Sequence, residues 1–362
     1  MIPVVEAFSP TYAQARAKFV AAARALRLPA ERHVHPVARG AEGEELSVDV
    51  AMLGNPAADA LLVLTSGMHG VEGFCGSGCQ TALLHDEATL AAVEASGACV
   101  LLHHAVNPYG FSHLHRTDED NVDLNRNFRD FSHPPARNAA YAGVHAMMVP
   151  AAWPPTADNA AAIAAYVAAN GRAALQSAVS SGQSDRPDGL FYAGTAPAWS
   201  NVVLREVLRR HGAGRAKLGW IDFHTGLGPW GHGEKIYSGP PEPAMIARAR
   251  AWYGADVTSF YDGSSTSAAL TGVSFQAALD ACPDAEFTGM ALEYGTLPFE
   301  ATLQALRADQ WLRNHPTADS ATRAAIKRQL RDAFHDESGE WKAMVYAQAR
   351  VAVLQALRAI RG

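Results

Sequence analysis

Short apolar runs alternate along the chain with alanine-rich segments whose apolar residues repeat about every 3.6 positions. The short runs predict strands that are buried on both faces, and the longer segments predict helices that cover them. We expect strands at LSVDVAML, ALLVLTS, ACVLLHHAV, DGLFYAG, LGWIDFHT, KIYSG and GMALEYG. The pattern therefore predicts an α/β fold, a three-layer α/β/α sandwich.

The helical segments predict how this sandwich is organised. A first helix, about residues 10–27, begins at the capping pair Ser9 and Pro10. Further helices are expected after Gly73, after Asp86, from Thr156 to about Ser180, after Ser200, after Pro243 and through a C-terminal helical layer of about 300–362. The linker-like stretch 180–189 is too short to separate independent domains. We expect a single domain, residues 1–362.

Composition and charge narrow the function classes. The 362 residues are 48% apolar, and the 30 basic and 36 acidic residues give a net charge of −6 with no long run of either sign. This balance argues against nucleic acid or an anionic membrane as partner. The four cysteines form no C-x-x-C pair, and no window approaches about 18 unbroken apolar residues. We expect a cytoplasmic protein, whose oligomeric state the sequence leaves open.

The first candidate chemistry lies in SGMHGVEGF, where His69 and Glu72 follow the ALLVLT run. A catalytic zinc site typically has two imidazoles and a carboxylate, with a fourth position left open. Gly67, Gly70 and Gly73 would let the backbone bend between strand and helix. An isolated H-x-x-E pair is also explained by a surface turn, so other residues must decide.

A third ligand candidate, His224, stands directly after an apolar run in GWIDFHTGLG. Asp222 lies two positions earlier and so points to the same side of a strand. Its carboxylate could accept the second N–H of the histidine, or it could contact the substrate. A strand-end histidine bonded to a loop is the alternative.

Glu293 stands inside the otherwise apolar strand GMALEYG. A carboxylate in such a position must be paired, protonated or functional, because burying it ionised costs several kcal/mol. Beside a metal it could take a proton from water and pass it to a leaving amine. A structural salt bridge with an arginine is the alternative.

The segment NPYGFSHLHRTDEDNVDLNRNF follows the ACVLLHHAV strand and is expected at the sheet edge where α/β folds build their sites. Arg116 could stabilise a developing oxyanion, and Asn125 with Arg126 forms a donor set suited to a carboxylate. A solvated charged loop is the alternative, and it fits DLNRNF less well than it fits residues 118–120.

Together these motifs resemble the zinc carboxypeptidase superfamily, in the order that this superfamily uses, over roughly residues 47–298. The resemblance implies a mixed, roughly eight-stranded sheet and one zinc ion held by His69, Glu72 and His224. It further implies Glu293 as general base, Arg116 as the residue that polarises the carbonyl, and Asn125 with Arg126 as the pair that binds the substrate carboxylate. The N-terminal helix and the C-terminal helices lie outside the resemblance.

The sequence departs from that of the digestive carboxypeptidases in ways that affect the predicted substrate. DFHTG and EYGTLPF resemble the deacylase branch, the aspartoacylases and succinylglutamate desuccinylases. The long spacing from Glu72 to His224 indicates an insertion within about 150–185 that could cover or narrow the cleft. Tyr261 and Tyr237 are weak candidates for the tyrosine that closes over the substrate in the peptidases.

The resulting hypothesis is a zinc-dependent hydrolase of an amide bond next to a free carboxylate, foremost a metallocarboxypeptidase acting on a small peptide. The first alternative is an N-acyl amino acid deacylase of the aspartoacylase type. The second is a non-catalytic metal- or ligand-binding protein, against which Glu293 and Arg116 argue because a pure metal site needs neither. A serine hydrolase is disfavoured because the chain lacks a G-x-S-x-G motif.

Overall fold

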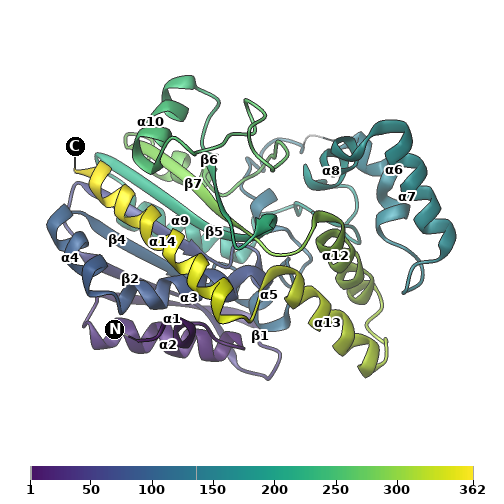
Figure 1. Cartoon of the computed structure of the whole chain (residues 1–362), viewed down its shortest axis with the longest axis horizontal. Coiled ribbons are helices and arrows are strands. Elements are labelled where there is room, and N and C mark those ends of the chain that lie inside the picture. Colours follow the sequence, from purple (N-terminus) through teal and green to yellow (C-terminus); the bar gives the residue numbers. More distant parts are fainter. Residues whose placement is uncertain (1, 136, 362) are drawn as a thin grey trace.

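The fold centres on one sheet, seen in a computed structural model that describes residues 2–135 and 137–361. Its strands are β1 Ala30–Arg39, β2 Glu45–Gly54, β3 Ala60–Ser66, β4 Cys99–His104, β5 Lys217–Trp230, β6 Gly233–Ser238 and β7 Glu286–Gly295. They lie in the order β1-β2-β4-β3-β5-β7-β6 (Figure 1). The predicted α/β sandwich is confirmed, with seven strands in the described residues where roughly eight were expected.

The sheet is mixed, with parallel pairing at its centre. Strands β4, β3, β5 and β7 pair in parallel, whereas β1, β2 and β6 join them antiparallel at the two sides. All residues of β3 from Leu61 to Ser66 are buried, as expected for a central strand covered on both faces. The carboxyl ends of β3, β5 and β7 therefore meet at one edge, which is where open α/β sheets place their sites.

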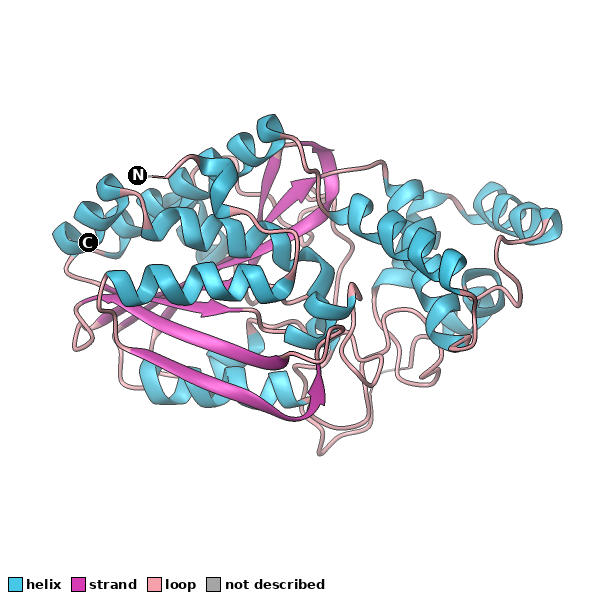
Figure 2. Cartoon of the chain, turned by 90° about the horizontal axis from the view of Figure 1, so that it is seen from below, coloured by secondary structure: helices cyan, strands magenta, loops and turns pink. Residues whose placement is uncertain are grey.

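Helices cover both faces of the sheet, as Figure 2 shows from below. Alternate residues of β3 separate the two layers: Leu62 and Leu64 pack in one apolar core, Leu61 and Val63 in the other. The first core includes residues of α1 Val4–Ala7, α2 Tyr12–Ala25, α3 Gly73–Leu84, α4 Glu87–Ser96, α10 Pro243–Tyr253 and α14 Gly339–Ile360. The second includes residues of α9 Trp199–Gly212 and α11 Gln276–Ala281.

The remaining helices lie toward the end of the sheet that carries the site (Figure 1). They are α5 Pro108–His113, α6 Ala139–Met148, α7 Ala157–Asn170, α8 Arg172–Ser180, α12 Phe299–Asn314 and α13 Ser320–Phe334. Residues of α6, α8, α12 and α13 share one apolar core with Val71, which lies in the short 3-10 helix η1 Gly70–Glu72. Helix α8 of the insertion and the C-terminal helices α12 and α13 thus belong to the same apolar core as the HGVE segment.

Three local expectations from the sequence were wrong. The run DGLFYAG forms a loop with a single bridge, Gln183 to Tyr192, instead of a strand, and Phe191 within it has a positive φ of 53°. Strand β1 was missed because it is an edge strand that carries polar residues and Pro36. The helix expected from Thr156 is interrupted at Gly171, which separates α7 from α8.

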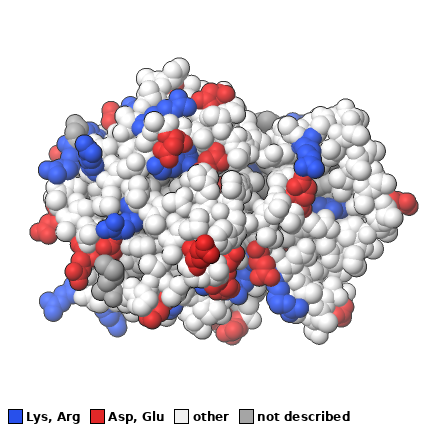
Figure 3. Space-filling view, in the orientation of Figure 1, with Lys and Arg blue, Asp and Glu red and all other residues white. Residues whose placement is uncertain are grey.

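The surface agrees with the charge distribution of the sequence. Figure 3 shows acidic and basic side chains interspersed over the visible face. Among the helices that the structure describes, none combines the length and the apolar character needed to cross a bilayer.

Candidate metal centre and active site

The candidate residues come together at the carboxyl ends of the three central strands. His69 follows β3 and precedes η1, and Glu72 is the last residue before α3. His224 on β5 and Glu293 on β7 are direct partners in the parallel register, so their side chains leave the sheet on the same face. The site residues therefore lie together because their strands are neighbours in the sheet, although they are far apart in the sequence.

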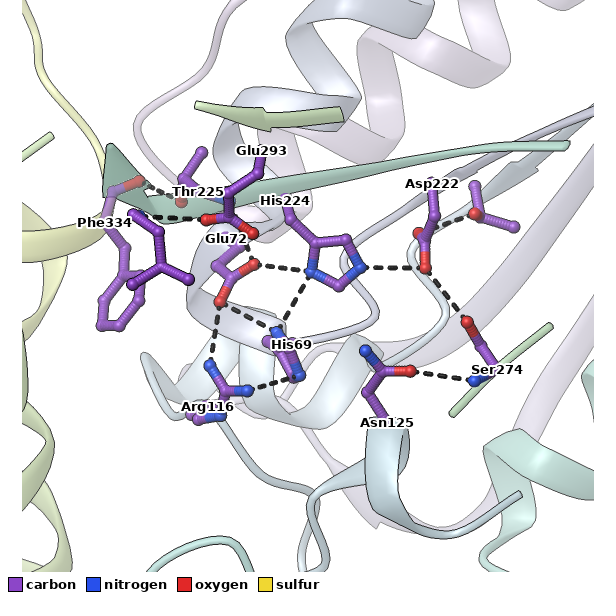
Figure 4. Close-up of polar contacts among 12 residues, drawn as sticks. His69, Glu72, Arg116, Asn125, Asp222, His224, Thr225, Ser274, Glu293 and Phe334 are labelled. Atoms are coloured by element: carbon purple, nitrogen blue, oxygen red, sulfur yellow. Dashed lines mark hydrogen bonds and ion pairs between the residues drawn. The ribbon is translucent and has the colours of Figure 1, made fainter. Parts of the chain in front are cut away.

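The Nδ1 atoms of His69 and His224 and the carboxylate group of Glu72 form a small triangle. His69 Nδ1 lies 2.9 Å from Glu72 Oε1, His224 Nδ1 lies 3.0 Å from Glu72 Oε2, and the two Nδ1 atoms are 3.2 Å apart (Figure 4). Tetrahedral zinc with bonds of about 2.0–2.1 Å has ligand edges of about 3.3 Å. All three residues are buried. The donor set and its spacing fit a zinc ion.

Carboxylates hold the outer nitrogens of both histidines. His224 Nε2 lies 2.9 Å from Asp222 Oδ2, and the other oxygen of Asp222 accepts a hydrogen bond from the Thr65 hydroxyl at 2.6 Å. His69 Nε2 lies 3.3 Å from Asp123 Oδ1. The Asp222 contact fixes the tautomer of His224 and turns its Nδ1 toward Glu72, whereas His69 Nε2 also accepts a hydrogen bond from Arg116 Nη2 at 2.7 Å. One of the two roles considered for Asp222, to accept the N–H of His224, is thus present in the geometry.

The pKa values of Glu72 and His224 differ strongly from their usual values. Burial alone would raise the pKa of Glu72, but the adjacent His69 and His224 outweigh it and hold this pKa below its usual range. Burial alone would lower the pKa of His224, but Asp222 and Glu72 raise it well above its usual value. Glu72 and His224 thus stabilise each other's charged forms, and the carboxylates of Glu72, Asp123 and Asp222 make the site attractive to a cation.

Glu293 is the second carboxylate at the centre. Burial and the nearby Glu72 raise its pKa to about 8. Its Oε1 accepts a hydrogen bond from the backbone N–H of Leu227 at 3.1 Å. The alternative of a structural salt bridge does not apply, because no ion pair to Glu293 is present among the described residues. A carboxyl group with a pKa near neutrality can both take and give a proton.

Arg116 borders the triangle on the side of His69. Its Nε donates to Asp123 at 2.9 Å, its Nη1 donates to Glu72 at 3.2 Å, and its Nη2 lies 2.7 Å from His69 Nε2. The guanidinium also lies 4.8 Å from the centre of the Phe191 ring, within cation–π range. Arg116 is thus fixed beside the candidate metal ligands His69 and Glu72, and it lines the cavity.

Asn125 and Arg126 lie in the same cavity but differ in how far their hydrogen-bond donors are engaged by the backbone. The Asn125 Oδ1 accepts the Ser274 backbone N–H at 2.9 Å, which turns Nδ2 toward His69 and His224 (Figure 4). Arg126 Nε and Nη2 donate to the Ser180 carbonyl at 2.9 and 2.6 Å, and Nη1 donates to the Asn125 carbonyl at 2.7 Å. Three of its five N–H groups are therefore engaged by backbone. Burial lowers its pKa to about 10.

Close backbone approach explains the glycines around His69. Gly67 has a positive φ of 66°, which supports the expected bend. Gly70 has no such φ, but a Cβ there would lie 2.0 Å from the carbonyl carbon of Gly110. A Cβ on Gly73 would meet the Phe111 ring at 2.6 Å. The HGVE segment is thus pressed against the loop that carries Arg116.

The cavity around these residues opens to solvent and includes all seven sequence-predicted site residues. The insertion contributes Gln176 and Ser180 to its wall, and Gln176 donates to the Thr266 carbonyl at 3.1 Å. Tyr237 also lines the cavity, but its hydroxyl donates to the Pro240 carbonyl. Tyr261 lies outside the lining and donates to the Gly239 carbonyl at 3.0 Å.

Sequence reasoning missed Asp123, Phe191, Ser274 and Phe334. Asp123 begins the DLNRNF motif and could have been found from its place next to Asn125 and Arg126. The other three carry no local signal, because they reach the site only through long-range packing.

Solved structures match this chain at low sequence identity. Bovine thrombin-activatable fibrinolysis inhibitor, solved in complex with tick carboxypeptidase inhibitor, matches 98% of this chain and 97% of its own, with a TM-score of 0.51 and 12% identity. A metallo-carboxypeptidase from Burkholderia cenocepacia matches 95% and 68%, with a TM-score of 0.46 and 13% identity. A putative succinylglutamate desuccinylase / aspartoacylase family protein from Shewanella amazonensis SB2B matches 79% and 73%, with a TM-score of 0.34 and 16% identity.

The TM-score of 0.51 agrees with the fold that the resemblance in sequence implied, and at 12% identity the likeness concerns the fold alone. A family model described as Protein of unknown function (DUF2817) matches residues 8–348, and the chain belongs to this family. A search of curated proteins gave no match.

Proposed function

We propose that the chain is a zinc-dependent hydrolase that cleaves an amide bond next to a free carboxylate. The observation that supports this most is the triangle of His69 Nδ1, His224 Nδ1 and the Glu72 carboxylate, with edges of 2.9–3.2 Å, beside Glu293 on the next strand. We assign the three residues as ligands of one zinc ion. When bound there, zinc would supply a Lewis acid that makes a water molecule nucleophilic near neutral pH.

Glu293 moves the proton in the proposed reaction. Its carboxylate accepts the proton of the attacking water and later donates it to the nitrogen of the leaving amine. A zinc ion bound at the ligand triangle would favour the ionised form of Glu293 and so oppose burial and the charge of Glu72, which both raise its pKa. The Leu227 N–H keeps the carboxylate oriented through both steps.

Arg116 stabilises the substrate carbonyl oxygen as it gains negative charge. Ligation through Nδ1 leaves the proton of His69 on Nε2, so that this nitrogen no longer accepts a hydrogen bond from Arg116 Nη2. Nη2 then becomes available to the carbonyl oxygen, while Asp123 keeps its hold on Nε.

The free carboxylate binds at Asn125 and Arg126 in this proposal. The Asn125 Nδ2 group provides one donor, and the two N–H groups of Arg126 that are not bonded to backbone provide the others. Because α8 occupies one edge of the Arg126 guanidinium through Ser180, the carboxylate has to approach its other edge.

The proposed substrate is a small molecule, either a peptide C-terminus or an N-acyl amino acid. The metallocarboxypeptidase follows from the sequence resemblance, and the deacylase from DFHTG and EYGTLPF. We further propose that residues 1–362 act as a single cytoplasmic metallohydrolase domain, since the insertion and the C-terminal helices both contribute to the cavity wall.

The test is hydrolysis of a panel of C-terminal peptides and N-acyl amino acids by the zinc-loaded protein. We expect Glu293→Gln to bind zinc as the wild type does and to lose about 10²–10⁴-fold in kcat. Glu286→Gln, at the exposed start of the same strand, is the matched control and should retain full activity. Binding of amino acids without hydrolysis of any panel member would support the non-catalytic alternative instead.

A further inference from the structure

One wall of the cavity is built by helices that lie outside the family resemblance. Phe299, Thr302, Leu303 and Leu306 all line the cavity, and their spacing of three, four and seven positions places them on one face of α12. Ala305 and Ala308 of the same helix are fully buried in the core. The cavity-facing side of α12 is therefore an apolar stripe with one threonine.

Phe334, the last residue of α13, brings this wall to the reacting centre. A Cβ on Gly226 would lie 2.6 Å from the Phe334 ring and 3.6 Å from Thr302, so ring, helix and strand end are in contact. The Phe334 carbonyl accepts a hydrogen bond from the Thr225 hydroxyl at 2.7 Å. Leu227, two residues after Thr225, donates its N–H to Glu293. The apolar wall thus begins directly beside the proposed general base.

Phe334, where this wall reaches the site, lies on the opposite side of the ligand triangle from Asn125. Figure 4 shows Phe334 and Thr225 on one side of Glu72 and His224, and Asn125 on the other. In the proposed reaction the bond to be cleaved lies at the triangle, and the amino acid half extends toward Asn125. The acyl half must therefore extend along α12 and Phe334.

The chemistry of the wall selects against polar acyl groups. Among the cavity-lining residues, charged or ionisable side chains other than Tyr237 are confined to His69, Glu72, Arg116, Arg126, Asp222, His224 and Glu293. The Thr225 and Thr302 hydroxyls already donate to the carbonyls of Phe334 and Pro298. A carboxylate on the acyl group, or the amide groups of a longer peptide, would lie against hydrocarbon without partners, which is costly.

We propose that the substrates are N-acyl amino acids whose acyl group is an apolar hydrocarbon chain or ring, bound along α12 and Phe334. This inference rests on the hydrolase function proposed above. Water adds its oxygen to the acyl carbon, the C–N bond breaks, and one water proton goes through Glu293 to the amine. The products are a fatty or aromatic carboxylic acid and a free amino acid.

The test compares N-acyl phenylalanines that carry acetyl, butanoyl, hexanoyl, octanoyl and succinyl groups, using the zinc-loaded protein. Each added methylene that reaches the wall should raise kcat/KM about fourfold, from about 0.8 kcal/mol per buried methylene. Butanoyl should exceed succinyl, which has the same chain length but a terminal carboxylate.

Variants of the wall separate a specificity role from a structural one. Phe299→Arg, at the half-buried first residue of α12, should flatten the chain-length dependence and reverse the preference between butanoyl and succinyl. Leu303→Arg serves as a second variant should the first not fold. Leu297→Arg adds the same charge at a side chain that is 39% exposed and outside the cavity lining, and it should leave the preference unchanged.

The possible outcomes distinguish this inference from the function on which it rests. Hydrolysis of acetyl or succinyl substrates, or of peptides, in preference to the octanoyl substrate would overturn the inference and leave the hydrolase intact. No hydrolysis of any amide next to a carboxylate would overturn both. An unchanged acyl preference in the folded Phe299→Arg or Leu303→Arg variant would show that α12 does not bind the acyl group.

Discussion

Asp222 offers a sharp test of how the metal ligands are oriented. Its carboxylate lies 2.9 Å from His224 Nε2, accepts from Thr65 at 2.6 Å and accepts from the Ser274 hydroxyl at 3.3 Å. Asp222→Asn keeps the shape but removes the negative charge that holds the proton of His224 on Nε2. Because such outer contacts are worth about 10–100-fold in metal affinity, we expect zinc binding to weaken by about 1.4–2.7 kcal/mol.

The assay is competition for zinc against a chelator of known affinity, at pH 7, with folding checked by circular dichroism. Ser274→Ala is the matched control, because it removes the longer 3.3 Å contact and leaves the Asp222 carboxylate in place. It should weaken zinc binding less than Asp222→Asn does. A folded Asp222→Asn protein that binds zinc within twofold of the wild type would refute this account of His224. Weaker substrate binding with unchanged zinc affinity would instead support the role of Asp222 as a substrate contact.

Two further predictions concern the frame around the site. Gly70→Ala forces a Cβ to within 2.0 Å of the Gly110 backbone, so the variant should lose more than tenfold in zinc affinity and about 1–3 kcal/mol of stability, measured by chelator competition and urea unfolding. Buried Asp309 bonds to Lys327 at 2.7 Å and to His115 at 2.8 Å, and these partners outweigh burial and lower its pKa. Asp309→Asn should lower the free energy of unfolding by about 3–5 kcal/mol at pH 7. Because the pKa of Asp309 is lowered in the folded state, the difference in unfolding free energy between variant and wild type should shrink as pH falls below about 4. A difference that stays constant with pH would contradict this prediction.

The central site could be predicted because its motifs stand at strand ends. His69, His224 and Glu293 each follow or end an apolar run, and these runs become β3, β5 and β7, which are neighbours in the sheet. The carboxyl ends of parallel strands meet, so residues more than 150 positions apart in sequence become partners. The roles assigned to these residues remain predictions.

Other features could not be read from the sequence. The run around Phe191 has the composition of a strand, yet it forms a loop in which the Phe191 ring packs against Arg116 and Arg126. The stripe on α12 looks like an ordinary apolar helix face until its position beside Phe334 is known. The engagement of Arg126 by Ser180 depends on how the insertion folds back, which no local pattern encodes.

The central claim is that His69, Glu72 and His224 hold one zinc ion, and metal content measures this most directly. The protein should be dialysed against zinc buffered at low free concentration and analysed by mass spectrometry of its elements. The wild type should retain about one zinc per chain, and the folded double variant His69→Ala, His224→Ala almost none. The control His133→Ala, His232→Ala, at two exposed histidines, should retain the wild-type content. A wild type without bound zinc, or a triangle variant that keeps it, would contradict the account.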